Sequence, residues 1–162
     1  MKSKSDTQME TKELTIIRIF DAPRELVFRA WIDPKMMARW WGPKGVTNPV
    51  CEIDAKVGGN IHIVMLAGKE LGHLAGQRWP MKGTFQELDP PKRLVFVNQA
   101  VDEDDNVLID ALTTVTFEEE NGKTKMTMKT TAKGVSPQAP QMLEGMETGW
   151  SQSFDKLADS LK

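Results

Sequence analysis

Apolar residues recur every three or four positions over the last stretch of the chain, from Ser136 to Leu161. This spacing places them on one side of a helix, which must be buried against the rest of the protein. Ser136 followed by Pro137 is typical of a helix start, so we expect one long helix with Ser136 as its N-cap. At 1.5 Å per residue this helix is about 35 Å long. Its apolar stripe consists of Met142, Leu143, Met146, Trp150, Phe154, Leu157, Ala158 and Leu161.

Two glycines, Gly145 and Gly149, interrupt this helical pattern. A glycine inside a helix costs about 1 kcal/mol relative to alanine, so its presence needs a physical reason. One reason is close packing of the helix backbone against a strand. The other is that the missing side chains leave space for a ligand beneath the helix, and the sequence alone leaves both explanations open.

The first part of the chain predicts a strand followed by two short helices. Alternation over residues 14–20 indicates the strand. Asp21 and Asp33 each precede a proline within two residues, so we expect each of them to be an N-cap. The second helix must stop at the WWGP run of residues 40–43. Residues 1–12 are polar and charged, so we expect a disordered tail there and one domain over residues 13–162.

Alternation with a period of two predicts six further strands before the C-terminal helix. Short turns join them, and the Asn121–Gly122 pair is a strong hairpin signal. We therefore expect an α+β fold, in which a curved antiparallel sheet of six to seven strands wraps around a long C-terminal helix. The six strands are expected at about residues 46–53, 60–66, 79–88, 93–98, 110–118 and 124–132.

Composition excludes several classes of protein. The chain has 162 residues, enough to bury a core without a disulfide or metal, and its single cysteine, Cys51, cannot form an internal disulfide. Its 21 basic and 23 acidic residues are interspersed and give a net charge of −2, which argues against a nucleic-acid partner. No apolar run of about 18 residues and no hydrophobic signal core occur, so we expect a cytoplasmic protein without membrane insertion.

Residues that carry chemistry are scattered along the chain. Cys51, His62 and His73 lack the convergent spacing of metal ligands, so we expect no metal site and no cofactor. His62 alternates with apolar neighbours and should face solvent. Glu87 shares strand parity with Phe85, so it is either an inward proton-transfer group or, more simply, a solvated carboxylate. No catalytic motif is recognisable, the catalytic residues are unknown, and a binding protein is favoured over an enzyme.

Five runs of the sequence together resemble one known family. They are IIRIFDAPRELVFRAWIDPKMMARWWGP, VGGNIHIVM, LDPPKRLVF, VTFEEENGKTKMTM and GMETGWSQSFDKLADSL, in order over about 150 residues. The chain is similar to the activator of heat-shock-protein ATPase homologue-like domains of the START-like (SRPBCC) superfamily. That resemblance implies a helix-grip fold, with the two short helices closing one end of a cavity. It does not define a function, because the superfamily includes lipid carriers, hormone receptors, polyketide cyclases and chaperone-binding domains.

Two classes of function therefore remain. The first is a binding protein for a small hydrophobic or aromatic ligand held between sheet and helix, with a cyclase or aromatase as an enzymatic variant. The second is a module that stimulates a chaperone ATPase, although the length leaves no room for the second domain of the chaperone activators.

The ligand-binding hypothesis predicts which side chains line the cavity. Asn98 shares parity with Phe96, so its amide either binds the ligand or caps the strand end. Methionine suits an irregular pocket and an irregular core equally well. The expected lining is Trp31, Met37, Trp40, Trp41, Ile61, Ile63, Met65, Phe85, Phe96, Asn98, Met142, Met146, Gly149 and Trp150.

Overall fold

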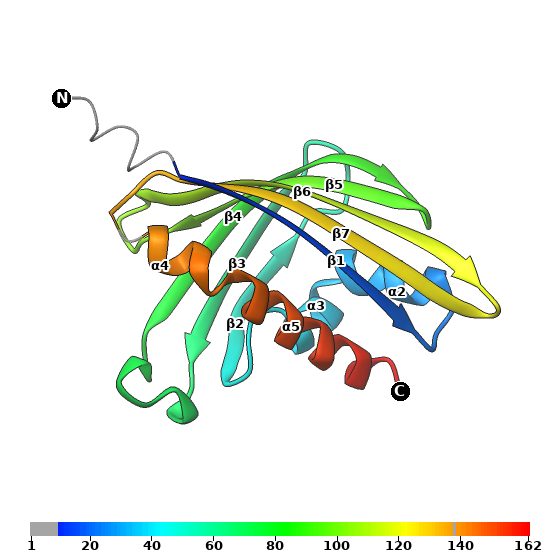
Figure 1. Cartoon of the computed structure of the whole chain (residues 1–162), viewed down its shortest axis with the longest axis horizontal. Coiled ribbons are helices and arrows are strands. Elements are labelled where there is room, and N and C mark those ends of the chain that lie inside the picture. The colour runs from blue at the N-terminus through cyan, green and yellow to red at the C-terminus, as the bar shows by residue number, and fades with distance from the viewer. Residues whose placement is uncertain (1–9, 138) are drawn as a thin grey trace.

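The computed structural model of the chain describes residues 10–137 and 139–162. Within these residues, seven strands form one antiparallel sheet in the order β1-β7-β6-β5-β4-β3-β2, and the helices lie on its concave side (Figure 1). This architecture confirms the expected α+β helix-grip fold. The elements are β1 (Thr11–Phe20), α2 (Arg24–Ile32), α3 (Pro34–Trp40), β2 (Val46–Ile53), β3 (Asn60–Ala67), the 3-10 helix η1 (Lys69–Leu74), β4 (Arg78–Asp89), β5 (Arg93–Val101), β6 (Val107–Glu120), β7 (Lys123–Gly134), α4 (Ala139–Glu144) and α5 (Met146–Ser160).

The β6–β7 hairpin forms where its sequence signal predicts it. Asn121 and Gly122 have φ angles of 54° and 81°, and two successive positive φ angles are what a type I′ turn requires. The turn holds the two strands in register from Glu120 opposite Lys123 to Ile109 opposite Gly134. Every second residue of these strands is buried on the concave face, so the hairpin forms one wall of the core.

The C-terminal helix is interrupted, contrary to the expectation of one continuous helix from Ser136. Gly145 separates α4 from α5. The Ser136 hydroxyl donates to the Leu108 carbonyl at 3.5 Å, and the residue that directly precedes α4 lies outside the described residues. Met142 was expected on the buried stripe but is 37% exposed, since α4 turns Leu143 toward the sheet instead.

The two short helices begin differently from each other. Asp33 is the N-cap of α3 as expected, and its carboxylate accepts from the backbone N–H of Lys35 at 2.9 Å. The prediction for Asp21 is wrong, because α2 begins after Pro23 and no side chain caps it. Proline presets the backbone for a helix start, so α2 can begin without a capping side chain.

Order begins slightly earlier than expected. Thr11 and Lys12 belong to β1, where they pair with Lys133 and Ala132 of β7. Residues 1–9 of the expected tail lie outside the described residues.

The glycine-rich segment after β3, expected as a loop, contains η1 with a kink at Gly72.

Candidate functional site

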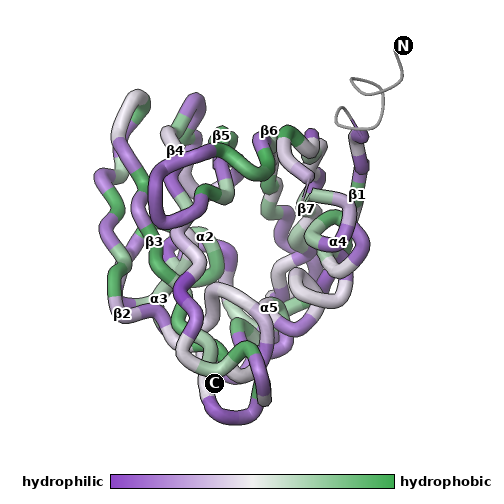
Figure 2. Tube along the Cα trace, turned by 90° about the vertical axis from the view of Figure 1, so that its left-hand side faces the viewer, coloured by the Kyte–Doolittle hydropathy of each residue, from purple (hydrophilic) through white to green (hydrophobic). Residues whose placement is uncertain are grey.

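Helix α5 bridges the two sides of the curved sheet (Figure 2). On the β1 side, the guanidinium of Arg18 pairs with the carboxylate of Asp155 at 3.0 Å. On the other side, the ammonium of Lys156 donates to the carbonyl oxygens of Trp41 and Pro43 at 3.4 and 3.3 Å. Burial of this ammonium lowers the pKa of Lys156. The helix is therefore anchored at both rims, with the central strands facing it across the concavity.

One end of the concavity is filled by aromatic side chains from four elements, α2, α3, β5 and α5. Trp31 of α2 lies at its centre, with ring centroids 4.8 Å from Trp40 and 6.1 Å from each of Phe96, Trp150 and Phe154. Trp31 and Trp40 are 1% and 0% exposed, so this end is solid core. The aromatic cluster consequently closes the concavity at the end covered by α2 and α3.

The opposite end of the concavity is more open. Asn98 and Met146 face inward there, yet each is only half-buried. Met65 and Trp150 are half-buried as well, although Trp150 also contacts the aromatic cluster. Gly149 is also half-buried, and a Cβ atom placed on it would meet no heavy atom within 4 Å. The explanation that Gly149 allows close backbone packing is therefore wrong, and the glycine borders open space.

A groove of about 480 Å³ lies at this open end, between the start of β4 and the β5–β6 hairpin. Trp79 lines the groove and pairs with Met65 across β4 and β3, so both side chains lie on the concave face. The acidic hairpin forms the other wall, where hydrogen bonds from Asn106 hold the pKa of Asp102 below its usual value. The groove is lined by Gly76, Gln77, Arg78, Trp79, Val101, Asp102, Glu103, Asp104 and Leu108. A second groove, of about 350 Å³, lies between β1 and α4.

The residues expected to line a cavity divide into three groups by exposure. Those that belong to the solid core are Trp31, Met37, Trp40, Trp41, Ile61, Ile63, Phe85 and Phe96. Those that remain half-buried around the open end are Met65, Asn98, Met146, Gly149 and Trp150. Met142 is the exposed one. The set expected to line one cavity is thus distributed between a packed core and a more open end.

Sequence reasoning missed two polar residues beneath the open end. Thr113 is 0% exposed and Thr130 is 3% exposed, and their hydroxyl oxygens are 2.9 Å apart. Thr113 also donates to the amide oxygen of Asn98 at 3.0 Å. The signal was present in the alternation, because a threonine at position 113 falls between Ala111 and Val115 on the apolar side of the strand.

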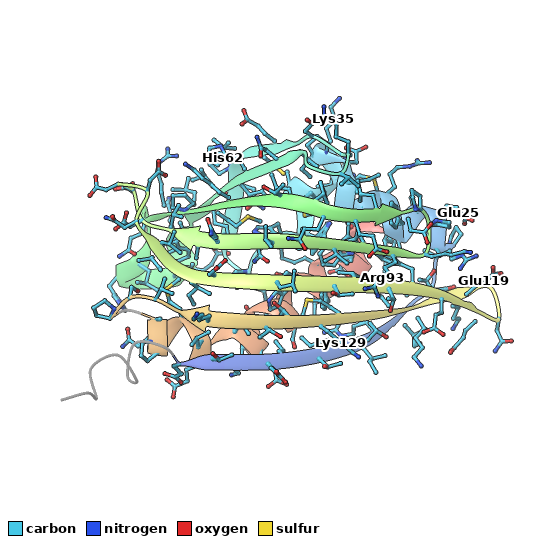
Figure 3. The ribbon with its side chains drawn as sticks, turned by 90° about the horizontal axis from the view of Figure 1, so that it is seen from above. Glu25, Lys35, His62, Arg93, Glu119 and Lys129 are labelled. Carbon is cyan, nitrogen blue, oxygen red and sulfur yellow. The ribbon has the colours of Figure 1, made fainter. Side chains whose placement is uncertain are left out.

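Glu87 and His62 both lie on the outer face of the sheet. A bulge between Phe85 and Glu87 breaks the parity from which Glu87 was assigned, and Glu87 pairs with Arg93 at 3.1 Å. The inward alternative for Glu87 is therefore wrong. His62 lies on the outer face as expected, 3.4 Å from Glu52. Figure 3 shows His62 and Arg93 among the polar side chains of this face.

Cys51 lies on the inner side of β2, paired with Ile63. Burial, with smaller contributions from the charges of Asp33 and Glu52, raises the pKa of the Cys51 thiol from 9.0 to about 11. Raising this pKa keeps the thiol protonated at neutral pH. Cys51 is therefore a poor nucleophile, because the thiolate is the reactive form.

Alkylation of Cys51 should be slow in the folded protein. Two pKa units reduce the thiolate fraction at pH 8 about a hundredfold, and the greater nucleophilicity of a more basic thiolate recovers about tenfold of this. We expect iodoacetamide to react at least tenfold more slowly than with the chain unfolded in urea, as measured by mass spectrometry. Equal rates in the two states would contradict a buried thiol.

The described part of the chain contains no cluster of three or more His, Cys, Asp or Glu residues able to hold a metal ion. Within the same residues, no helix combines the length and the apolar character needed to cross a membrane.

Comparison with known proteins gives a consistent family and fold. Residues 21–162 match the family described as activator of Hsp90 ATPase homolog 1-like protein. A crystal structure from Chromobacterium violaceum is 29% identical, with the match covering 92% of this chain and 96% of that one at a TM-score of 0.76. An NMR structure from Arthrobacter aurescens is 25% identical, covering 92% and 85% of the two chains at a TM-score of 0.76. The AHSA1 protein from Silicibacter pomeroyi is 25% identical, covering 93% and 97% at a TM-score of 0.73. Among curated proteins, none matches the chain.

Proposed function

The chain belongs to the family of activator of Hsp90 ATPase homolog 1-like proteins, and from this premise we propose that it binds a small hydrophobic or aromatic ligand. The family and the fold support a ligand-binding or activator domain in general terms. The ligand would enter at the open end of the concavity and lie between α5 and the sheet. It would contact Met65, Met146 and Trp150.

The observation that carries this proposal is the free space beside Gly149. No heavy atom lies within 4 Å of a Cβ built at this position, although the residue belongs to a half-buried part of α5. Glycine in a helix interior is unfavourable by about 1 kcal/mol, so a helix that needed only stability would have alanine there. Space kept open beside apolar and aromatic side chains is typical of a ligand site.

The positions of the titratable groups support binding without catalysis. Glu87, which strand parity raised as a possible proton-transfer group, lies on the outer face, as does His62. Cys51 is inward but holds its proton, because burial raises its pKa to about 11. A cyclase or aromatase would need an acid or base within reach of the ligand.

Replacing Gly149 with leucine should abolish ligand binding while preserving the fold. The leucine side chain would occupy the free space, and removal of a helical glycine adds about 1 kcal/mol of helix propensity. We expect the neutral dye N-phenylnaphthylamine to show a fluorescence increase with the wild-type protein and at least a tenfold weaker affinity for Gly149→Leu. The thermal midpoint should stay the same or rise.

Gly145→Leu is the matched control for this experiment. Gly145 is exposed, and a Cβ atom there would approach only the Gln141 carbonyl, at 3.8 Å. The control adds the same side chain one helical turn earlier, at the break between α4 and α5, without entering the concavity, so dye affinity should match the wild type. The proposal fails if the wild-type protein does not bind the dye, or if both leucine variants bind it equally well.

A second candidate function is stimulation of a chaperone ATPase, which the family description names. The observation that favours it is the exposure of Ile17 and Ile19, at 54% and 52%, on the outer side of edge strand β1. Exposed apolar side chains at a sheet edge are suited to protein contacts. An ATPase assay of Hsp90 with and without this protein tests that function, and no change in rate would exclude it.

A further inference from the structure

A short row of polar side chains crosses the otherwise apolar concave face. Asn98 of β5, Thr113 of β6 and Thr130 of β7 are linked by hydrogen bonds of 3.0 and 2.9 Å. Thr113 and Thr130 are fully buried, whereas Asn98, at one end of the row, is half-buried. Burying hydroxyl groups is unfavourable unless they are hydrogen-bonded. The two buried threonines meet this requirement through the hydrogen bonds of the row.

The directions of these hydrogen bonds determine what Asn98 presents to the concavity. The single hydroxyl proton of Thr113 goes to Oδ1 of Asn98, so Thr130 must be the donor to Thr113. Oδ1 of Asn98 is therefore occupied, and the orientation of the amide is set. Among the described residues, none accepts a hydrogen bond from Nδ2 of Asn98. The row thus ends in an amide with two N–H donors at Nδ2, beside an Oδ1 that already accepts one hydrogen bond.

Three of the nearest neighbours of Asn98 on the concave face are small residues. Its cross-strand partners are Gly83 on β4 and Ala111 on β6, and neighbours in this register lie on the same face of the sheet. The next residue of β5 on this face is Ala100. Asn98 is thus longer than these three neighbours, whereas Phe96 precedes it on the same face of β5.

The charges near Asn98 favour an uncharged acceptor. Arg18, on the concave side of β1, is already paired with Asp155 at 3.0 Å. Lys12, on the same side of β1, donates to the Leu143 carbonyl at 3.0 Å. The groove at the open end has Asp102, Glu103 and Asp104 along one wall. Arg78 also lines this groove, but one basic residue against three acidic ones leaves the lining net acidic, which disfavours an anion and not a neutral molecule.

We propose that the ligand is an uncharged apolar molecule with a carbonyl oxygen that accepts a hydrogen bond from Nδ2 of Asn98. Thr113 and Thr130 are positioning residues, because they orient the amide without contacting the ligand. The inference rests on the proposed binding function and specifies its ligand class. A donor that is held in place before binding loses little freedom when it bonds. It therefore increases the affinity for a ligand that has an acceptor at the matching position.

The experiment compares two probes that differ in one group. Methyl naphthyl ketone has the carbonyl, and isopropenylnaphthalene has a methylene group in place of its oxygen. Their dissociation constants are measured by equilibrium dialysis for the wild type, Asn98→Asp, Thr113→Val and Thr113→Ser, with a thermal melt of each protein. The quantity of interest is the affinity of the ketone relative to that of the alkene, because a general loss of packing affects both probes.

Asn98→Asp keeps the shape of the side chain but replaces the donor with an acceptor. We expect the relative affinity for the ketone to fall about threefold to tenfold, the range of one net hydrogen bond. Thr113→Val removes the bond that orients the amide and should lower the relative affinity by a smaller factor. Thr113→Ser keeps the hydroxyl and should behave as the wild type.

The outcomes separate this inference from the proposed function. If the wild type binds neither probe, the binding function itself fails, and the inference with it. If both probes bind and Asn98→Asp leaves their relative affinity unchanged, binding stands and the carbonyl anchor is wrong. If Asn98→Asp does not fold, Asn98→Ser is measured in its place. Its affinity for the ketone relative to the alkene must then also fall at least threefold.

Discussion

Replacing Phe154 with alanine is expected to lower the free energy of unfolding by about 3 to 5 kcal/mol. The ring is fully buried, and its centroid lies 5.5 Å from that of Trp150 and 6.1 Å from those of Trp31 and Trp40. The variant would leave a cavity where α5 meets α2 and α3. Aromatic neighbours are too large and rigid to close that cavity by small movements.

The measurement is urea denaturation, supported by a thermal melt. For a protein of this size, each kcal/mol corresponds to about 2 to 4 °C, so the midpoint should fall by about 6 to 20 °C. Glu147→Ala is the control, because Glu147 lies on α5 and is exposed. Its effect should stay within about 0.5 kcal/mol. A Phe154→Ala midpoint within two degrees of the wild type would mean that α5 is not docked as described.

Replacing Trp40 with alanine should have an effect of similar size, for a partly different reason. Trp40 is fully buried, and its indole N–H donates to the Ala30 carbonyl at 3.0 Å, which ties α3 to α2. Loss of the ring removes about 3 to 5 kcal/mol of packing. It also leaves the Ala30 carbonyl without its indole donor. We expect urea denaturation to show a loss of at least 3 kcal/mol.

Phenylalanine variants separate the hydrogen bond from the packing. The indole N–H of Trp31 is buried with no acceptor among the described residues, whereas that of Trp40 is paired. Trp31→Phe therefore removes an unsatisfied donor, and Trp40→Phe breaks a bond. We expect Trp40→Phe to be the more destabilising by about 1 to 3 kcal/mol. Equal losses would mean that the bond to Ala30 contributes nothing measurable.

The ligand proposal and the stability predictions concern opposite ends of the same concavity. The Trp31 cluster makes one end rigid, and Gly149 with Asn98 leaves the other end accessible. A rigid wall beside an open space is a favourable arrangement for binding, because little side-chain freedom is lost when a ligand enters. Substitutions at Phe154 and Trp40 should therefore change stability first, whereas substitutions at Gly149 and Asn98 should change binding first.

Local patterns in the sequence predicted most of the fold. The Asn121–Gly122 turn and the Asp33 cap depend on a few adjacent residues, and both were confirmed. Strand alternation depends on the period of two in the backbone, and it correctly placed His62 on the outer face. These features are determined locally, so no knowledge of distant contacts was required.

The failures occurred where a single residue changes the geometry. The bulge after Phe85 places Glu87 on the outer face of the sheet. Strand parity assumes a regular strand, so it cannot predict a bulge. The interruption at Gly145 turned Met142 outward, although the spacing of apolar residues continued across it. Gly145 was visible in the sequence as an exception to the helical pattern, but the periodicity of the apolar residues did not show that the helix ends there.

The sequence by itself determined the order of the strands, the curved antiparallel sheet with a helical C-terminal segment, and the family. Only the tertiary structure decided which inward residues are packed and which border free space, because that depends on distances between segments far apart in the chain. It also joined Asn98 to Thr113 and Thr130, which lie on three different strands. Hydrogen bonds between strands depend on register and direction, and neither is encoded in the periodicity of a single strand.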